Sequence, residues 1–349
     1  MAKKKKLLPK DFEALLEQGD LDRLKAVFDT CELDARGGVF KQTALAFASC
    51  PDDLARWLAE QGADISAGDT YGETPLHSRA RSWQGRIGVL LDLGADVNRG
   101  EGGRGTPLHG AAAGCHMDNV RQLLEHGAHV DALDEDGFTP LEHALQRCSN
   151  AQIERMAPLA AALLDAGART TKRTRDFVTR IGTDFEFHRA NFNQESRDAA
   201  SAALDRLYAL FDVPPVPRRA THDGRSPIVA TADRWQDRHQ QLWALLVPSS
   251  GAAATVQGEV IRISGRIADE LDGNGGANWD AQYRAMADAW LAHVGSGKAL
   301  PGPELHSAAQ VIAEVKQRTG DARRLCELAV AWVTLNPGPV ALSPPSYHR

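Results

Sequence analysis

The tetrapeptide Thr-Pro-Leu-His occurs twice in this 349-residue chain, at residues 74–77 and 106–109, and recurs as Thr-Pro-Leu-Glu at 139–142. A weaker copy, Thr-Ala-Leu, begins at Thr43, and the steps between the four threonines are 31, 32 and 33 residues. A second marker, glycine followed by alanine, comes after each copy, at Gly62, Gly94, Gly127 and Gly167. Two independent markers with one period of about 33 residues indicate a tandem structural repeat.

The residue types in the motif predict two short helices in each copy. Threonine is a good N-cap, and proline in the first helical position loses no hydrogen bond and already has a helical φ angle. The leucines of the motif, Leu76, Leu108 and Leu141, are expected in the core between neighbouring copies. The glycine of the second marker is expected to end the second helix in a left-handed conformation.

This pattern resembles the ankyrin repeat, whose signature contains Thr-Pro-Leu-His-x-Ala. The resemblance implies helix-turn-helix units with β-turn fingertips, and it implies that His77 and His109 tie adjacent turns together. A degenerate first unit is visible in Phe12, Leu15 and Leu16 and the apolar positions that follow Gly19. Five units therefore cover about residues 10–170.

Several copies depart from the family pattern. The spacing from the motif threonine to the marker glycine varies between units. Compared with the fourth unit, it is two residues shorter in the second, one residue shorter in the third and seven residues longer in the fifth. The fourth fingertip, Glu101 to Gly105, has Arg104 where the family has its turn glycine, which leaves the geometry of that turn open. No departure removes a core leucine, so the stack is expected to form.

The rest of the chain carries no repeat marker and is divided by its own patterns. Apolar residues at helical spacing predict a capping helix and a second helix before a proline-rich linker, and then a small bundle of four or five helices. The predicted fold class is therefore all-α, an ankyrin-repeat solenoid followed by an α-helical bundle. Its expected segments are a disordered basic tip (1–9), the repeats (10–170), a helical cap and Pro-rich linker (171–229), an α-helical domain (230–336) and a disordered tail (337–349).

Charge and cysteine content limit the classes of function. The formal net charge is −6, and residues 1–172 hold 20 Lys and Arg against 26 Asp and Glu, so the acidity belongs to the first half. An acidic surface repels nucleic acid and attracts a basic partner. Five scattered cysteines, no secretory leader and no long apolar run predict a cytoplasmic protein, with neither a cofactor nor a metal site expected.

Three stretches of the sequence bear on chemistry: a phosphate-loop-like turn that is rejected, a weak arginine group and one candidate polar surface. Gly295 to Lys298 resembles a phosphate loop but lacks the required flanking glycine and hydroxyl residue. Three arginines near the linker, Arg218, Arg219 and Arg225, form a weak case for nucleic-acid contact. The candidate polar surface is a helix face and the loop that follows it. A solvated surface is the favoured interpretation, and a ligand pocket is the alternative. The residues of this candidate site are Glu259, Arg262, Arg266, Asn278 and Asp280.

The repeats favour a protein that works by binding another protein. The fold does not fix the identity of fingertip and first-helix positions, and the predicted partner-binding residues are Thr70, Tyr71, Glu73, Arg81, Arg104, Glu135, Asp136 and Phe138, with the two aromatic residues as anchors. The Arg- and Ala-rich composition favours a bacterial source. Bacterial proteins that resemble this architecture include immunity proteins that neutralise a toxin, and this is the favoured hypothesis. An adaptor with a second binding domain, and an enzyme with a catalytic helical domain, are the alternatives.

Overall fold

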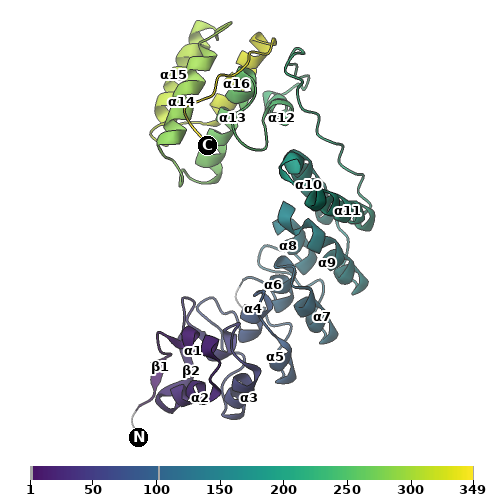
Figure 1. Ribbon diagram of the computed structural model, residues 1–349, viewed down its shortest axis with the longest axis vertical. Coiled ribbons are helices and arrows are strands. Elements are labelled where there is room, and N and C mark those ends of the chain that lie inside the picture. Colours follow the sequence, from purple (N-terminus) through teal and green to yellow (C-terminus); the bar gives the residue numbers. More distant parts are fainter. Residues whose placement is uncertain (1–2, 101–102, 349) are drawn as a thin grey trace. The chain divides into compact units, whose positions relative to one another are not determined.

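The computed structural model describes residues 3–100 and 103–348, and these divide into two compact units. Unit 1 runs to Phe185 and resumes for Phe192–Val216, whereas unit 2 comprises Glu186–Asn191 and the chain from Pro217 onward. The division lies inside the proline-rich segment instead of at its end near residue 229. The fold is mostly helical, which confirms the predicted all-α class (Figure 1).

Five pairs of short helices form most of unit 1. Within this stack, α4, α6 and α8 follow one another in one row and α5, α7 and α9 in a second (Figure 1). The second pair begins with a single 3-10 turn, in the copy of the motif that has alanine in place of proline. The pairs are α1 (Phe12–Gln18) with α2 (Leu21–Thr30), η1 (Ala44–Ala46) with α3 (Asp52–Glu60), α4 (Pro75–Ala80) with α5 (Gly88–Asp92), α6 (Pro107–Ala113) with α7 (Met117–Glu125), and α8 (Pro140–Arg147) with η2 (Asn150–Gln152) and α9 (Ile153–Asp165).

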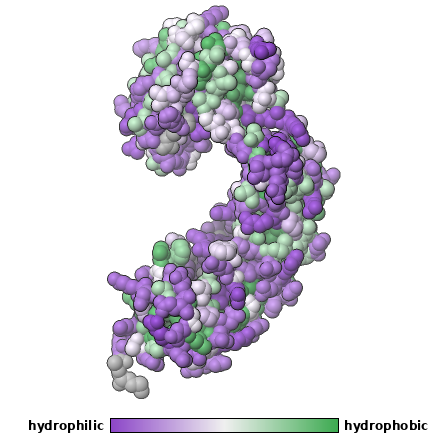
Figure 2. All heavy atoms as spheres, in the orientation of Figure 1, coloured by the Kyte–Doolittle hydropathy of each residue, from purple (hydrophilic) through white to green (hydrophobic). Residues whose placement is uncertain are grey.

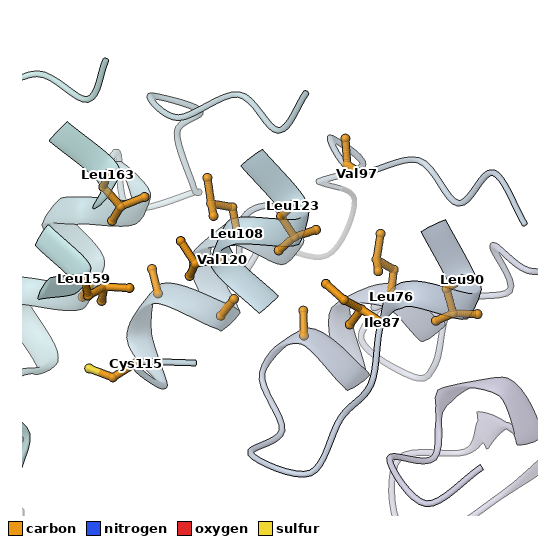
Figure 3. Close-up of a cluster of buried hydrophobic side chains, with 14 of the residues drawn as sticks. Leu76, Ile87, Leu90, Val97, Leu108, Cys115, Val120, Leu123, Leu159 and Leu163 are labelled. Atoms are coloured by element: carbon orange, nitrogen blue, oxygen red, sulfur yellow. The ribbon is translucent and has the colours of Figure 1, made fainter. Parts of the chain in front are cut away.

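The motif leucines form the continuous core of the stack. Leu76, Leu108 and Leu141 are buried to 1% exposure or less, and the leucines of the second helices pack beside them (Figure 3). The Gly-Ala marker has its expected geometry, since all four glycines have a positive φ between 83° and 98°. A side chain at these positions would be strained, which explains why the marker recurs with glycine.

Two longer helices continue the stack beyond the fifth pair. They are α10 (Lys172–His188) and α11 (Gln194–Phe211), joined by η3 (Arg189–Asn191). Helix α11 packs against α9, and its buried stripe runs from Ala200 to Phe211. These helices therefore cover the apolar end of the last repeat, as terminal elements of a solenoid must.

The basic tip contains a strand, so the prediction of disorder over residues 1–9 is wrong for Lys5–Leu7. This strand, β1, pairs in parallel with β2 (Cys31–Gly37), and β2 pairs antiparallel with β3 (Gln42–Thr43). Leu8, which follows β1, is buried in the core of the stack. The sheet thus closes the amino-terminal end of unit 1 with backbone hydrogen bonds that a lysine run does not reveal.

In three repeats, a polar side chain three residues after the capping threonine links the repeat to the next element. The backbone N–H groups of Thr74 and Thr106 donate to Nδ1 of His77 and His109 at 3.3 and 3.0 Å. Nε2 of each ring therefore carries a proton. It donates that proton to the next fingertip, at Gly105 O and Phe138 O, over 3.1 Å in both cases.

The fifth repeat has Glu142 in this position, and the chemistry of its neighbour explains the change. Thr139 N donates to one carboxylate oxygen at 3.3 Å, and the Thr171 hydroxyl donates to the other at 2.8 Å. Arg173 adds a bond of 3.3 Å. Because the next element offers donors instead of a carbonyl, an acceptor replaces the imidazole donor here.

Unit 2 is a bundle of five helices around its own core. Helix α13 is its centre, with buried residues on every face from Gln257 to Ser264, and it is extended by a short π-helix. The proline-rich segment leads into the bundle, where Arg219 donates to carbonyls at the end of α12, among them Trp243 O at 3.3 Å. The helices are α12 (Trp235–Leu246), α13 (Val256–Ala268) with η4 (Asp269–Gly273), α14 (Ala281–Val294), α15 (Gly302–Val315) and α16 (Arg323–Leu335).

The segment 337–348, for which the sequence predicts disorder, packs across α13 and is here called the C-terminal strap. Val256 N donates to Val340 O at 2.8 Å, and Leu342 N donates to Ala254 O at 3.0 Å. The Gln257 amide donates to two strap-side carbonyls and accepts from Val340 N at 3.0 Å. The prediction of a disordered tail is therefore wrong for these residues.

The histidine links predict how the stability of unit 1 depends on pH. Burial lowers the pKa values of His77 and His109 below the 6.5 of an unfolded chain. In the unfolded chain the rings take up protons as the pH falls below 6.5, whereas the folded stack resists protonation, so we expect the free energy of unfolding to fall between pH 7 and pH 5. Denaturant titrations across this range measure the slope.

The variant H77Q/H109Q keeps an acceptor and a donor at each position but cannot titrate. We expect it to lose part of the pH dependence, while the exposed control His126→Gln keeps all of it. A slope unchanged in the double variant would show that these links do not sense protons.

Candidate functional site

Two fingertips of unit 1 have a backbone turn fixed by an aspartate at its start. Asp69 Oδ1 accepts from Tyr71 N and Glu73 N at 2.7 and 3.1 Å, and Asp134 Oδ1 accepts from Asp136 N and Phe138 N at 3.0 and 2.9 Å. The predicted fourth fingertip includes Glu101 and Gly102, which lie outside the described residues.

Glu73 is the centre of the first group of predicted site residues. Its side chain is only 4% exposed, and Arg81 Nη1 and Arg104 Nη1 lie 3.2 and 3.5 Å from its carboxylate oxygens. Burial raises the pKa of Glu73, and the two arginines oppose that shift. Glu73 is therefore not a free surface residue, and its carboxylate positions two guanidinium groups.

The two arginines in turn hold two aromatic rings. Arg104 Cζ lies 4.8 Å from the centre of the Tyr71 ring, and Arg81 Cζ lies 5.7 Å from that of Phe40. The two rings are 6.1 Å apart. Tyr71 is 51% exposed. We call Phe40, Tyr71, Arg81 and Arg104, with Glu73 beneath them, the aromatic–arginine cluster.

Phe40 belongs to the aromatic–arginine cluster, but it is not among the candidate residues predicted from the sequence. It lies 31 residues before Tyr71, the same step that separates Thr43 from Thr74, so the repeat spacing could have placed it on a fingertip. Its neighbour Val39 is 89% exposed. Thr70, a predicted contact residue, instead links the two fingertips, because its N–H and hydroxyl both donate to Phe40 O at 3.0 and 2.9 Å.

A groove of about 580 Å³ joins the cluster to a second group of predicted residues. Its lining includes Glu73, Arg81 and Arg104 on one side and Asp134, Glu135 and Asp136 on the other. The last three residues are here called the acidic fingertip. Asp134 Oδ2 lies 3.3 Å from His143 Nδ1, and burial lowers the pKa of that imidazole while Asp134 opposes the shift. The groove is thus built from charges of both signs.

Phe138, the second predicted anchor, is half-buried against its own chain. Its ring centre lies 6.1 Å from that of Phe177 and 4.9 Å from Arg173 Cζ. The face of unit 1 that Figure 2 shows is mostly hydrophilic, with separate hydrophobic patches. Tyr71 and Phe40 are therefore more exposed to solvent than Phe138.

The second predicted site, on α13, is neither a solvated face nor an open pocket. Glu259 and Arg262 are 0% and 1% exposed, and they are joined by bonds of 2.8 and 2.6 Å. Ala253 N and the Tyr347 hydroxyl donate to the two carboxylate oxygens at 2.9 and 2.8 Å. Burial alone would raise the pKa of Glu259, but these donors, with Arg262 foremost, lower it overall.

The remaining residues of that predicted site have separate structural contacts. Asp280 caps α14 by accepting from Gln282 N and Tyr283 N at 2.9 and 3.1 Å. Asn278 N donates to the buried Glu270 at 2.5 Å. Arg266 is half-buried on α13. The five residues of this predicted site thus lie in a buried ion pair, at a helix cap, in a loop and, for Arg266, at a separate position on α13.

In residues 3–100 and 103–348, no three His, Cys, Asp or Glu side chains gather in a way that could hold a metal ion. Within the same ranges no helix has the length and apolar character needed to cross a membrane.

Comparison with known proteins agrees with the repeat geometry. Helical pairs with capped first helices and hydrogen-bonded fingertips define a solenoid repeat protein. Residues 84–173 match the family model of ankyrin repeats, in three copies, so the chain contains ankyrin repeats, and these indicate a role in protein–protein interaction. No curated protein matches the chain.

The strap predicts a measurable contribution of Tyr347 to the stability of unit 2. Replacing it with phenylalanine removes the donor to Glu259 and leaves the ring, and a hydrogen bond to a buried charged group contributes about 1.5–3 kcal/mol. We therefore expect Tyr347→Phe to lower the free energy of unfolding of unit 2 by about that amount. Denaturant unfolding followed by the fluorescence of its tryptophans measures this.

The exposed neighbour His348 supplies the control, because its side chain is at the surface. His348→Ala should unfold as the parent does. Equal stability of Tyr347→Phe and the parent would contradict a structural role for the strap.

Proposed function

We propose that unit 1 captures a protein partner through the aromatic–arginine cluster and the acidic fingertip beside it. The observation that carries this proposal is the half-exposed Tyr71 ring, which is held between Phe40 and Arg104 above a buried carboxylate. Tyrosine and arginine are enriched among the residues that dominate binding energy. A ring held in place before binding also loses less conformational entropy when the partner arrives.

The charge of the surface supports a basic partner. Removing the four lysines at residues 3–6 leaves residues 1–172 with 16 basic and 26 acidic side chains, a net charge of −10. Such a field accelerates association with a cationic protein, and charges at the rim of an interface act mainly on the association rate. The acidic fingertip is the part of the groove that such a partner would meet.

An inhibitor of a basic toxin or effector, as in an immunity protein, is the form of this function that we favour. A tight, single-partner complex at a preformed surface suits inhibition. An adaptor role requires a second binding surface on unit 2, and it is distinguished by a partner that unit 2 retains when the cluster is mutated.

A catalytic role for unit 2 is the less supported alternative. Glu259 and Arg262 are enclosed by Ala253 and Tyr347 and offer no atom to a substrate in this conformation. Alanine at either position tests folding of the bundle instead of catalysis, so Arg266 and Asn278, which are more exposed, are the informative substitutions for this alternative.

The proposed function predicts the effect of removing the two rings. The variant F40A/Y71A should weaken the affinity for a partner captured from the native host by at least about tenfold, because hot-spot truncations cost about 2 kcal/mol or more. The control Val229→Ala removes an apolar side chain of unit 2 that is more exposed than either ring. Calorimetry with the identified, purified partner measures the dissociation constants.

The charge variant E135Q/D136N should slow association at low salt and have little effect at high salt, since rim charges are screened. For an inhibitor, co-expression of the parent chain should also relieve the toxicity of the partner, and F40A/Y71A should not. Unchanged affinity in F40A/Y71A would exclude the cluster as the binding surface.

A further inference from the structure

Trp83 is the most unusual surface residue of unit 1 outside the fingertips. It lies in the loop between α4 and α5 and is 80% exposed. A solvent-exposed tryptophan forgoes more apolar burial than most side chains would, and tryptophan is among the residues most enriched at binding hot spots. The loop that carries it does not contribute to the fingertip groove, apart from Arg81 at its start.

Buried polar side chains fix the loop that presents Trp83. Arg79 is fully buried; its Nε donates to Leu45 O at 2.7 Å, and its Nη1 donates to Arg86 O at 3.1 Å. From the next repeat, Asn119 Nδ2 donates to Ala80 O and Gly85 O, both at 3.1 Å. The backbone is also packed too closely for a side chain at Gly85, whose Cβ would lie 1.9 Å from Arg79 O.

A polar groove of about 740 Å³ adjoins the tryptophan. Its lining includes Asp52, at the start of α3, and Asp118, in the first turn of α7, together with Gln122 and Arg86. The Asp118 side chain is 92% exposed, and its carboxylate lies 4.0 Å from Arg121 Nη1. The lining thus contains two carboxylates, those of Asp52 and Asp118, and one guanidinium group, that of Arg86.

We propose that this Trp83 groove is a second docking surface, which takes an arginine or lysine side chain of a protein partner. A cation over the indole face gains cation–π attraction, and carboxylates beside it supply the counter-charge. The negative charge of the lining favours a cationic side chain, because Asp52 and Asp118 would repel an acidic one. The Trp83 groove shares no lining residue with the fingertip groove, so both surfaces can be occupied independently.

A fluorescent hexa-arginine peptide, blocked at both ends, is a suitable probe, and its anisotropy at low salt measures binding to the full chain. Trp83→Leu should weaken binding about fivefold, the loss expected for a cation–π contact at a partly exposed site. The variant D52N/D118N should weaken it further. Thermal unfolding checks that both variants fold, as expected for exposed side chains.

The variant E135Q/D136N is the matched control, because it also removes two negative charges, but from the fingertips. It should bind the peptide more tightly than D52N/D118N does. Equal binding by Trp83→Leu and the parent, or equal losses in the two charge variants, would overturn the proposal and leave only a general attraction to an acidic protein. A concentration-dependent dimer that is lost in Trp83→Leu, seen by light scattering, would overturn it in favour of self-association.

Because F40A/Y71A leaves this groove intact, its effect on the peptide separates the two surfaces. Unchanged peptide binding in F40A/Y71A is expected whether or not the fingertip proposal holds. A loss of peptide binding in that variant would place the cationic site at the fingertips and contradict the Trp83 groove.

Discussion

The integrity of unit 1 depends on one recurring hydrogen bond, from the side chain three residues after a helix cap to the start of the next structural element. His77 and His109 donate to carbonyls of the following fingertip, and Glu142 accepts from Thr171 where the repeats end. Each of these side chains also satisfies the backbone N–H of its own capping threonine. The same contact therefore completes a helix end and sets the register of its neighbour, which places the fingertips, and with them the candidate binding surface, in a fixed series.

Both units use buried polar groups to position parts of the chain that carry little apolar surface. Arg79 and Asn119 hold the loop of Trp83, Glu73 holds two arginines, and the Glu259–Arg262 pair receives the C-terminal strap. Burying such groups is costly unless they find hydrogen-bond or ion-pair partners, and these partners restrict the segment to one arrangement. In unit 1 this restriction presents side chains to solvent, whereas in unit 2 it covers the central helix.

The repeats could be predicted from the sequence because their caps, core leucines and glycines act locally and recur with one period. Phe40 was missed because its copy of the motif has alanine where the others have proline. Glu259 and Arg262 were misjudged because a spacing of three residues is the same for a buried ion pair and an exposed one. The strap and β1 depend on partners far along the chain, such as Tyr347 and Glu259, 88 residues apart, and no local pattern records such a pairing. Likewise, the burial of Glu73 follows from two arginines that only the folded stack brings to it.

The reach of the C-terminal strap also affects the order in which the two units can form during synthesis. Contacts in the stack join residues about one repeat apart, for example 28 between His77 and Gly105, so each pair of helices can pack soon after it is made. Helix α13, in contrast, obtains the Tyr347 hydroxyl only after 88 more residues have been added. On the ribosome, unit 1 can therefore be complete while the buried carboxylate of Glu259 in unit 2 still lacks the Tyr347 hydroxyl. Unit 2 is then the part of the nascent chain that relies longest on protection from aggregation.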